Sequence, residues 1–191
     1  MPKKDNRQKI LDTCLYVAGV HGCRFTIDDI QNELQISRRT IYRYFSSKEE
    51  ILIALIEQVG EEVHTRQREI YDDPTLSTVE KLQEILTVKT REEDLISPEK
   101  LYEYEKYYPH VYDYFMKGYE REWFLVEKII QQGIDEGVFR EYSVELIKLM
   151  IQNGMQILCK GDFLDRNDIK YHTALRQMVN IVLQGILSDE K

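Results

Sequence analysis

The chain has 191 residues, of which 42% are hydrophobic and 31% charged, a composition that describes a globular protein and excludes a disordered chain. Its formal net charge is −8, but residues 1–50 have a net charge of +2 and residues 51–191 a net charge of −10. Because the acidic part would repel a polyanion, we expect any nucleic-acid contact to be confined to residues 1–50.

The N-terminal part shows three short helical patterns. Apolar residues recur at helical spacing over residues 10–18, and Gly22 stands where that helix should end. Thr26 is suited to cap a second helix, and Ser37 to cap a third one over residues 37–45. Three helices in so short a stretch predict a small helical head.

The rest of the chain is predicted to be helical as well. Ser46 or Ser47 would cap a long helix that reaches about Tyr71, where Asp72-Asp73-Pro74 interrupts the pattern. Further helices are expected over residues 77–94, 98–107, 110–136, 144–160 and 168–187. The sequence therefore predicts an all-α protein with a helix-turn-helix head, residues 1–50, joined by the long helix to a helical body, residues 51–191.

Three cysteines and a basic N-terminus bear on the compartment. Cys14, Cys23 and Cys159 are odd in number and lack the spacing of a disulfide framework, which favours the reducing cytoplasm. Basic residues precede the apolar run as in a signal peptide, but Asp12 interrupts this run and its apolar residues keep helical spacing. No run approaches the roughly 20 apolar residues of a membrane helix. We expect a cytoplasmic protein with no membrane partner.

The third helical pattern has a basic face. Residues 35–48 contain three arginines, then a lysine, and no acidic residue. On a helical wheel Ile41 and Phe45 lie on one side, while Arg39 and Arg43 point away from it. Two arginines placed in this way can bind guanine edges in the major groove of DNA. The simpler interpretation is a solvated basic face on an ordinary helical bundle.

Hydroxyl and basic side chains beside these arginines would complete a DNA contact. Thr40 is suited to a thymine methyl group or a phosphate, and Ser37, Tyr42 and Lys48 are suited to phosphate oxygens. The free amides at the start of the long helix offer a second anion site. The predicted DNA-binding residues are Thr26, Ser37, Arg38, Arg39, Thr40, Tyr42, Arg43, Tyr44 and Lys48.

The stretch SRRTIYRYF at residues 37–45, followed by KEEIL at residues 48–52, resembles the tetracycline-repressor (TetR) family of bacterial transcriptional regulators. The resemblance covers roughly residues 8–57. It implies a three-helix DNA-binding head, a linking helix, and an all-helical body that dimerises and binds an inducer. The chain departs from the family at Gln31, where Ala is usual, and at Gln35, where Gly is usual. A left-handed turn at Gln35 would cost about 1 kcal/mol relative to glycine.

Two C-terminal helices have broad apolar faces that predict a dimer. One recognition helix reads few base pairs, and helix-turn-helix proteins bind palindromic DNA in pairs. Two helices from each subunit would form a four-helix interface. The alternative is that these faces fill the core of one chain. The predicted interface residues are Ile147, Met150, Ile151, Gly154, Leu175, Met178, Val179, Val182 and Ile186.

Residues 101–123 hold seven tyrosines. Tyrosine offers an apolar face and a polar tip, a common lining for aromatic or amphipathic ligands, and acidic neighbours would suit a cation. Aromatic stripes are also usual in protein cores. The predicted pocket residues are Tyr104, Tyr108, Tyr112, Phe115, Tyr119, Trp123, Met155 and Cys159.

Catalytic motifs do not stand out in the sequence. His21, His64, His110 and His172 are scattered, and none has the spacing of metal ligands. We therefore expect no enzymatic activity, no metal and no cofactor. The sequence predicts a repressor that binds a palindromic operator in double-stranded DNA as a homodimer and is released by a small-molecule inducer. The alternative function is a small-molecule-binding or protein-interaction bundle that does not bind DNA.

Overall fold

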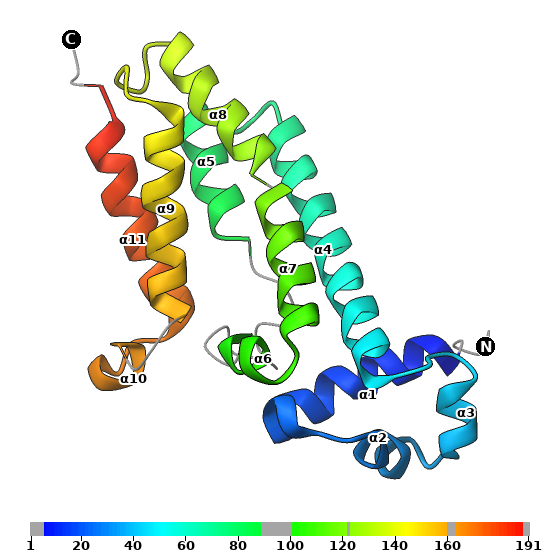
Figure 1. Ribbon diagram of the computed structural model, residues 1–191. Coiled ribbons are helices and arrows are strands. Elements are labelled where there is room, and N and C mark those ends of the chain that lie inside the picture. The colour runs from blue at the N-terminus through cyan, green and yellow to red at the C-terminus, as the bar shows by residue number, and fades with distance from the viewer. Residues whose placement is uncertain (1–5, 89–100, 122, 160–162, 189–191) are drawn as a thin grey trace. The chain divides into compact units, whose positions relative to one another are not determined.

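A computed structural model describes residues 6–88, 101–121, 123–159 and 163–188 (Figure 1). Within these ranges every regular element is a helix, and an isolated β-bridge joins Phe139 to Leu187. The all-α class predicted from the sequence is confirmed. None of the described helices combines the length and the apolarity that crossing a membrane requires.

The helices form two compact units. Unit 1 comprises the described residues of 1–61 and 90–117, and unit 2 those of 62–89 and 118–191. Two helices, α4 (Lys48–Asp72) and α7 (Pro109–Arg121), contribute residues to both units. Residues 101–117 therefore belong with the N-terminal helices, although they follow the long helix in sequence.

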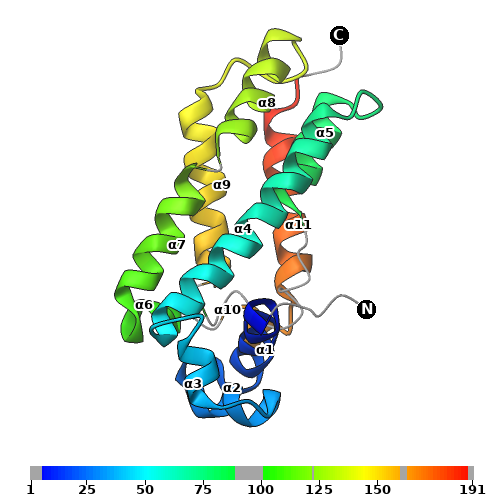
Figure 2. The ribbon, with the colours of Figure 1, turned by 90° about the vertical axis from the view of Figure 1, so that its right-hand side faces the viewer.

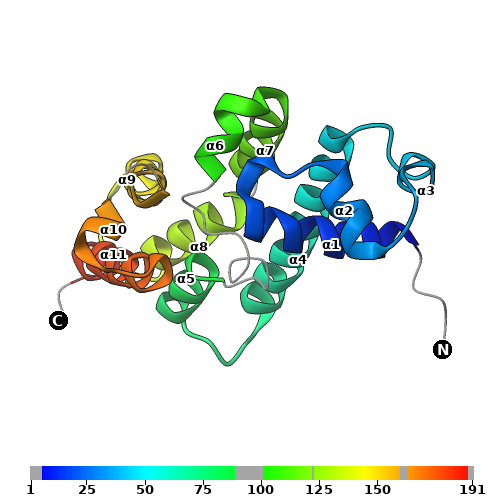
Figure 3. The same cartoon turned by 90° about the horizontal axis from the view of Figure 1, so that it is seen from below.

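Unit 1 is built around one apolar core. Besides parts of α4 and α7, its elements are α1 (Asn6–His21), η1 (Gly22–Arg24), α2 (Ile27–Leu34), α3 (Arg38–Tyr42) and α6 (Leu101–Tyr107). α1 packs on α2, and α2 packs on α3 (Figure 3). Ile10, Ile30 and Ile41 are fully buried in this core, and α6 and α7 add Tyr104 and Val111 to it. The short helices of the head are thus held by apolar burial that they share.

The helix boundaries in the head follow the predicted residues. α1 ends before Gly22, which has a left-handed φ of +64°. Thr26 caps α2, Ser37 caps α3, and the Ser47 hydroxyl accepts a hydrogen bond from the Glu50 amide at the start of α4. These side chains satisfy amides that the first turn of a helix leaves without partners.

Several predicted helices are shorter than expected. The one over residues 37–45 ends at Tyr42, because the Ile41 carbonyl accepts from the amides of both Tyr44, at 2.9 Å, and Phe45, at 3.1 Å. The one over residues 110–136 is two helices, α7 and α8 (Phe124–Asp135). The apolar spacing did not show the break between α7 and α8, because Trp123 continues the helical pattern across it.

The remaining predicted helices lie close to their expected positions. The prediction over residues 98–107 corresponds to α6, and the first residues of this range lie outside the described part. The prediction over residues 77–94 corresponds to α5, which ends at Leu86; residues 87 and 88 are not helical, and residues 89–94 lie outside the described part. The other elements are α5 (Thr78–Leu86), α9 (Val144–Cys159), α10 (Phe163–Asn167) and α11 (Tyr171–Ile186).

Unit 2 is a closed arrangement of four helices. α5 packs on α8 and α11, and α9 packs on the same two helices; Figure 2 shows α5 beside α11. Ile129, Ile151 and Val179 are fully buried at the centre. Gly133 of α8 lets Phe139 approach closely, since a Cβ there would stand 2.1 Å from the Phe139 ring. This close packing gives unit 2 a core of its own.

Candidate nucleic-acid interface

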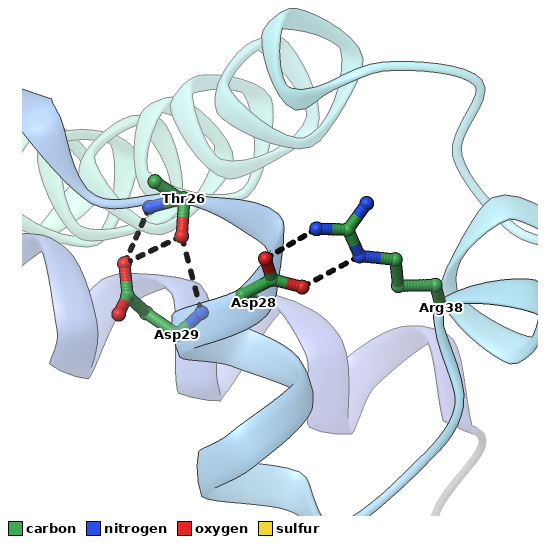
Figure 4. A network of polar contacts seen from close by, with 4 residues as sticks. All are labelled: Thr26, Asp28, Asp29 and Arg38. Atoms are coloured by element: carbon green, nitrogen blue, oxygen red, sulfur yellow. Dashed lines mark hydrogen bonds and ion pairs between the residues drawn. The ribbon is translucent and has the colours of Figure 1, made fainter.

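The start of α2 is fixed by a reciprocal pair of side-chain bonds (Figure 4). The Asp29 carboxylate accepts from the Thr26 amide at 2.6 Å and from the Thr26 hydroxyl at 2.8 Å. The Thr26 hydroxyl in turn accepts from the Asp29 amide at 3.4 Å. The bond from the Thr26 amide lowers the pKa of Asp29, because it stabilises the charged carboxylate. Thr26, predicted as a DNA contact, has its polar groups engaged in this cap.

The turn between α2 and α3 depends on one left-handed residue. Gln35 has φ 54° and ψ 40°, the left-handed conformation that the family resemblance implied for this position. Its side-chain amide donates to the Asn32 carbonyl at 2.5 Å, which offsets part of the strain of a non-glycine residue. Ser37 then starts α3 by accepting from the Thr40 amide at 3.1 Å, and the two hydroxyl groups lie 2.9 Å apart.

Arg38 connects α3 to α2 through an ion pair. Its Nε donates to Oδ1 of Asp28 at 2.5 Å, and its Nη2 donates to Oδ2 of the same carboxylate (Figure 4). The pair lowers the pKa of Asp28, chiefly through the hydrogen bonds from Arg38. Because both side chains are about half exposed, at 58% and 48%, the pair contributes little net stability. Its bidentate geometry orients α3 relative to α2.

Arg39 and Arg43 have no such attachment. Both side chains are exposed, and neither guanidinium forms a hydrogen bond or an ion pair within the described part of the chain. Tyr42, beside them, is 49% exposed, whereas Ile41 of the same helix is fully buried. The inward and outward faces predicted for α3 are confirmed by this burial pattern.

Lys48 and Tyr44 are placed differently from the prediction. The Lys48 ammonium donates to the carbonyls of Cys23, at 2.8 Å, and Phe25, and to the Tyr108 hydroxyl at 2.8 Å. Tyr44 is partly buried against the core of unit 1. The sequence identified the basic character of Lys48 but contained no sign that residues 23–25 and 108 would surround it.

The expected anion site at the start of α4 is occupied from within the chain. The Glu50 carboxylate accepts from the Ser46 amide at 2.5 Å and from the Ser46 hydroxyl at 2.6 Å. These bonds lower the pKa of Glu50, so a negative charge already stands at this helix start. A DNA phosphate would meet repulsion there, which corrects the expectation of a free amide site.

The predicted pocket residues divide between the two units. Tyr104, Tyr108, Tyr112 and Phe115 lie in unit 1, where Tyr104 is buried in the core and Tyr108 packs against it. The other four lie in unit 2: Tyr119, Trp123, Met155 and Cys159. The aromatic residues of the segment 101–123 therefore lie in two different units, which their spacing along the sequence did not indicate.

Unit 2 brings three of these residues together. The Tyr119 hydroxyl lies 3.3 Å from Sδ of Met155, and the Tyr119 ring meets the Trp123 ring edge-on, with the ring centres 5.8 Å apart. Burial raises the pKa of Tyr119. Unit 2 also holds two buried amide atoms with no hydrogen-bond partner among the described residues, Oε1 of Gln67 and Nε2 of Gln152. The sequence analysis missed both glutamines.

Most predicted dimer residues instead fill the core of unit 2. Those buried in it are Ile147, Ile151, Leu175, Val179 and Ile186. Gly154 is covered by Met178, whose Sδ lies 2.3 Å from where a Cβ would stand, and Val182 is half-buried. Met150 remains, at 58% exposed. The five buried side chains are unavailable to a partner, because they already face the core of unit 2.

A second apolar face of α9 was missed. The exposed apolar residues of α9 and α11 are Leu146, Leu149, Met150, Ile157 and Ile181. Leu146, Met150 and Ile157 recur at helical spacing, on a side about 100° around the helix from the buried Ile147 and Ile151. The sequence contained this pattern, but a helix apolar on two sides does not reveal which side is internal.

Within the described ranges, no group of three acidic, histidine or cysteine side chains could hold a metal ion.

Comparison with known proteins identifies relatives of this chain. Residues 10–55 match the family described as bacterial regulatory proteins, tetR family. The chain is 25% identical over 173 residues to the uncharacterised HTH-type transcriptional regulator YvaF of Bacillus subtilis (strain 168), covering 89% of this chain and 90% of YvaF.

Solved structures of regulators share the fold. A TetR transcription regulator from Haloarcula marismortui ATCC 43049 is similar with a TM-score of 0.77 at 18% identity, covering 96% of this chain and 99% of that one. The transcriptional regulator FadR from Bacillus subtilis, in complex with stearoyl-CoA, is similar with a TM-score of 0.67 at 20% identity, covering 94% and 98%.

The carboxylates of α2 predict acid sensitivity. The pKa values of Asp28 and Asp29 are lowered in the folded state, so the unfolded chain binds more protons as the pH falls below the ordinary aspartate range. The contribution of these two carboxylates to the free energy of unfolding should therefore be complete at neutral pH. It should be lost as the pH falls toward the folded-state pKa values. Urea denaturation at several pH values measures this dependence.

Asp28→Asn and Asp29→Asn should each reduce the slope of stability against pH. Asp113→Asn, at an exposed position of α7, is the matched control and should leave that slope unchanged. Equal slopes in all four proteins would show that the α2 carboxylates do not govern acid unfolding.

Proposed function

We propose, on the premise that this chain is a transcriptional regulator of the tetR family, that it represses transcription in the cytoplasm by binding a palindromic operator as a homodimer, and that a small molecule bound in unit 2 releases it. Relatives and family are transcriptional regulators, and the chain is not an enzyme. The observation that carries the proposal is the exposed pair of Arg39, in α3, and Arg43, the residue that follows its last turn.

The proposed DNA contact uses α3 as a recognition helix in the major groove. Arg39 and Arg43 supply planar donors that match the acceptors on guanine. The hydroxyls of Ser37, Thr40 and Tyr42 supply phosphate contacts, which position the helix without specifying sequence. Residues 1–50 form the DNA-binding domain in this proposal, and residues 51–191 provide dimerisation and ligand binding.

Dimerisation is proposed through the exposed apolar face of α9 and α11. Five large apolar side chains remain in solvent there, although unit 2 has a complete core. A second copy of the chain would remove them from water and pair two recognition helices, which must meet successive major grooves about 34–36 Å, or a multiple of this, apart. This face replaces the predicted interface while retaining Met150.

Ligand binding is proposed for the aromatic cluster of Tyr119, Trp123 and Met155 in unit 2. The cluster has an apolar surface with one hydroxyl, and the buried amides of Gln67 and Gln152 offer an acceptor and a donor in the same unit. FadR, which has the same fold, holds stearoyl-CoA. A ligand that prefers the conformation with wrongly spaced α3 helices would lower operator affinity roughly 5- to 150-fold.

Replacing the α3 arginines tests the DNA contact. Arg39→Ala and Arg43→Ala should each reduce discrimination between the preferred DNA fragment and a mutated one by about 1–3 kcal/mol, because a bidentate guanine contact is lost. Fluorescence anisotropy with fragments selected from genomic DNA measures this. Wild-type affinity should also fall steeply with salt.

Arg68→Ala is the matched control, since it removes the same charge from an exposed position of α4 in unit 2. It should leave sequence preference unchanged. If the α3 variants keep wild-type preference, α3 does not read bases. If the wild-type protein binds no fragment at low salt, the alternative function, a helical bundle that does not bind DNA, is favoured.

A charge on the α9 face tests the dimer. Met150→Lys should shift the protein toward the monomer, because each copy would bury an ammonium group in the apolar interface. Light scattering coupled to size exclusion measures the mass. Val20→Lys, at an exposed apolar position of α1, is the control and should remain dimeric. A dimeric Met150→Lys protein would place the interface elsewhere.

Trp123 is the only tryptophan of the chain, so its fluorescence reports on the proposed ligand site directly. Adding the small-molecule extract of the purified protein back to ligand-stripped protein should change this fluorescence. Met155→Ala should weaken the response, whereas Met116→Ala, in unit 1, should not. Retention of a ligand by native mass spectrometry, with unchanged fluorescence and unchanged affinity in Met155→Ala, would locate the ligand outside this cluster.

A further inference from the structure

Lys48 joins three segments of unit 1 that are distant in sequence. Lys48 is the first residue of α4. Its ammonium group donates to two backbone carbonyls of the η1–α2 connection and to the Tyr108 hydroxyl. The same nitrogen lies 3.8 Å from the centre of the Phe25 ring and 4.6 Å from that of Tyr108. An ammonium group has three donors, and all three are used here.

The carbonyls that Lys48 holds lie immediately beside the start of α2. Cys23 and Phe25 precede Thr26, the N-cap of α2, and the Phe25 side chain is buried. A cation fixed to both carbonyls restrains the direction in which the chain enters α2. Since Arg38 orients α3 on α2, the position of the recognition helix depends in turn on this entry.

Tyr108 connects α6 to α7. Its amide donates to the Tyr104 carbonyl at 2.7 Å, and its own carbonyl accepts from Val111 and Tyr112, both at 3.0 Å. α6 also contacts η1 directly, because the Cys23 thiol donates a hydrogen bond to the Glu103 carboxylate at 3.2 Å. The α6–α7 segment therefore contacts the connection that precedes α2 at more than one point.

From these contacts we infer that Lys48 is a positioning residue for the recognition helix, and that the Tyr108 hydroxyl is the point through which the α6–α7 segment controls it. The inference rests on the proposed function and adds a route for its regulation. Lys48 acts here through the entry to α2 and not as a phosphate contact. α7 begins at Pro109, directly after Tyr108, and contains Tyr119 of the aromatic cluster.

The energetic consequence follows from population. With the Lys48–Tyr108 bond in place, the entry to α2 is held in one arrangement. Without it, other arrangements become populated, and the apparent dissociation constant for DNA rises by the inverse of the competent fraction. The number of phosphates contacted does not change, so the salt dependence of binding stays the same.

Two variants and their combination test the inference. Lys48→Met keeps the aliphatic stem and removes the ammonium, and Tyr108→Phe keeps the ring and removes only the hydroxyl. We expect each to weaken DNA binding about tenfold, the order of a lost hydrogen bond to a charged group. The double variant should be no weaker than the stronger single variant, because the bond lost in Tyr108→Phe is one of those lost in Lys48→Met. Tyr114→Phe, which removes a hydroxyl of α7 bonded to Glu57, is the matched control and should leave binding unchanged.

The slope of log affinity against log salt separates positioning from phosphate contact. An unchanged slope in Lys48→Met supports the inference, whereas a slope reduced by about one unit assigns Lys48 to a phosphate and overturns it. Additive effects of the two substitutions would also overturn it. Equal loss in Tyr114→Phe would show that any hydroxyl removed from α7 has this effect.

Hydrogen exchange keeps the test independent of DNA binding. Faster exchange of the amides of residues 27–31 in both variants, with wild-type exchange in the core of α1, is expected if Lys48 orders the entry to α2. If the wild-type protein binds no DNA, the proposed function fails, while exchange still decides whether the contact orders α2. Wild-type exchange in both variants would overturn the inference by itself.

Discussion

The structure of the head depends on one constraint: α3 has five residues, too few to be stable as an isolated helix. It persists because Ile41 is completely buried, Phe45 follows it into the same core, and Ser37 satisfies an amide of its first turn. Any element that shapes this core also shapes the direction of α3. α6 and α7 contribute to the core, so residues far along the sequence help to hold α3 in place.

The cations of the head divide into two roles by their partners. Arg38 is tied to Asp28, and Lys48 to backbone carbonyls and Tyr108, so these two charges hold the helices in place. Arg39 and Arg43 remain in solvent on the outer face. On a chain with a net charge of −8, the exposed guanidinium groups of Arg39, in α3, and Arg43, directly after it, form a localised positive site. Orientation matters because bidentate recognition tolerates little angular error.

Unit 2 shows the same division for apolar side chains. α9 is apolar on two sides: Ile147 and Ile151 pack inside, whereas Leu146 and Met150 remain in solvent. Because one side of α9 is buried, the other side stays exposed in a single chain, where a dimer could cover it. The tyrosine-rich segment divides as well, because Tyr108 supports the head and Tyr119 belongs to the aromatic cluster.

The sequence by itself determined what depends on neighbours along the chain: the caps at Thr26 and Ser37 and the opposed faces of α3. Local hydrogen bonding and helical periodicity suffice for these. Tertiary structure alone decided which partner each long side chain meets. Lys48 contacts Tyr108, sixty residues away, and the inner face of α9 was chosen by packing against α8 and α11. Such choices depend on distances between helices, which no local pattern contains.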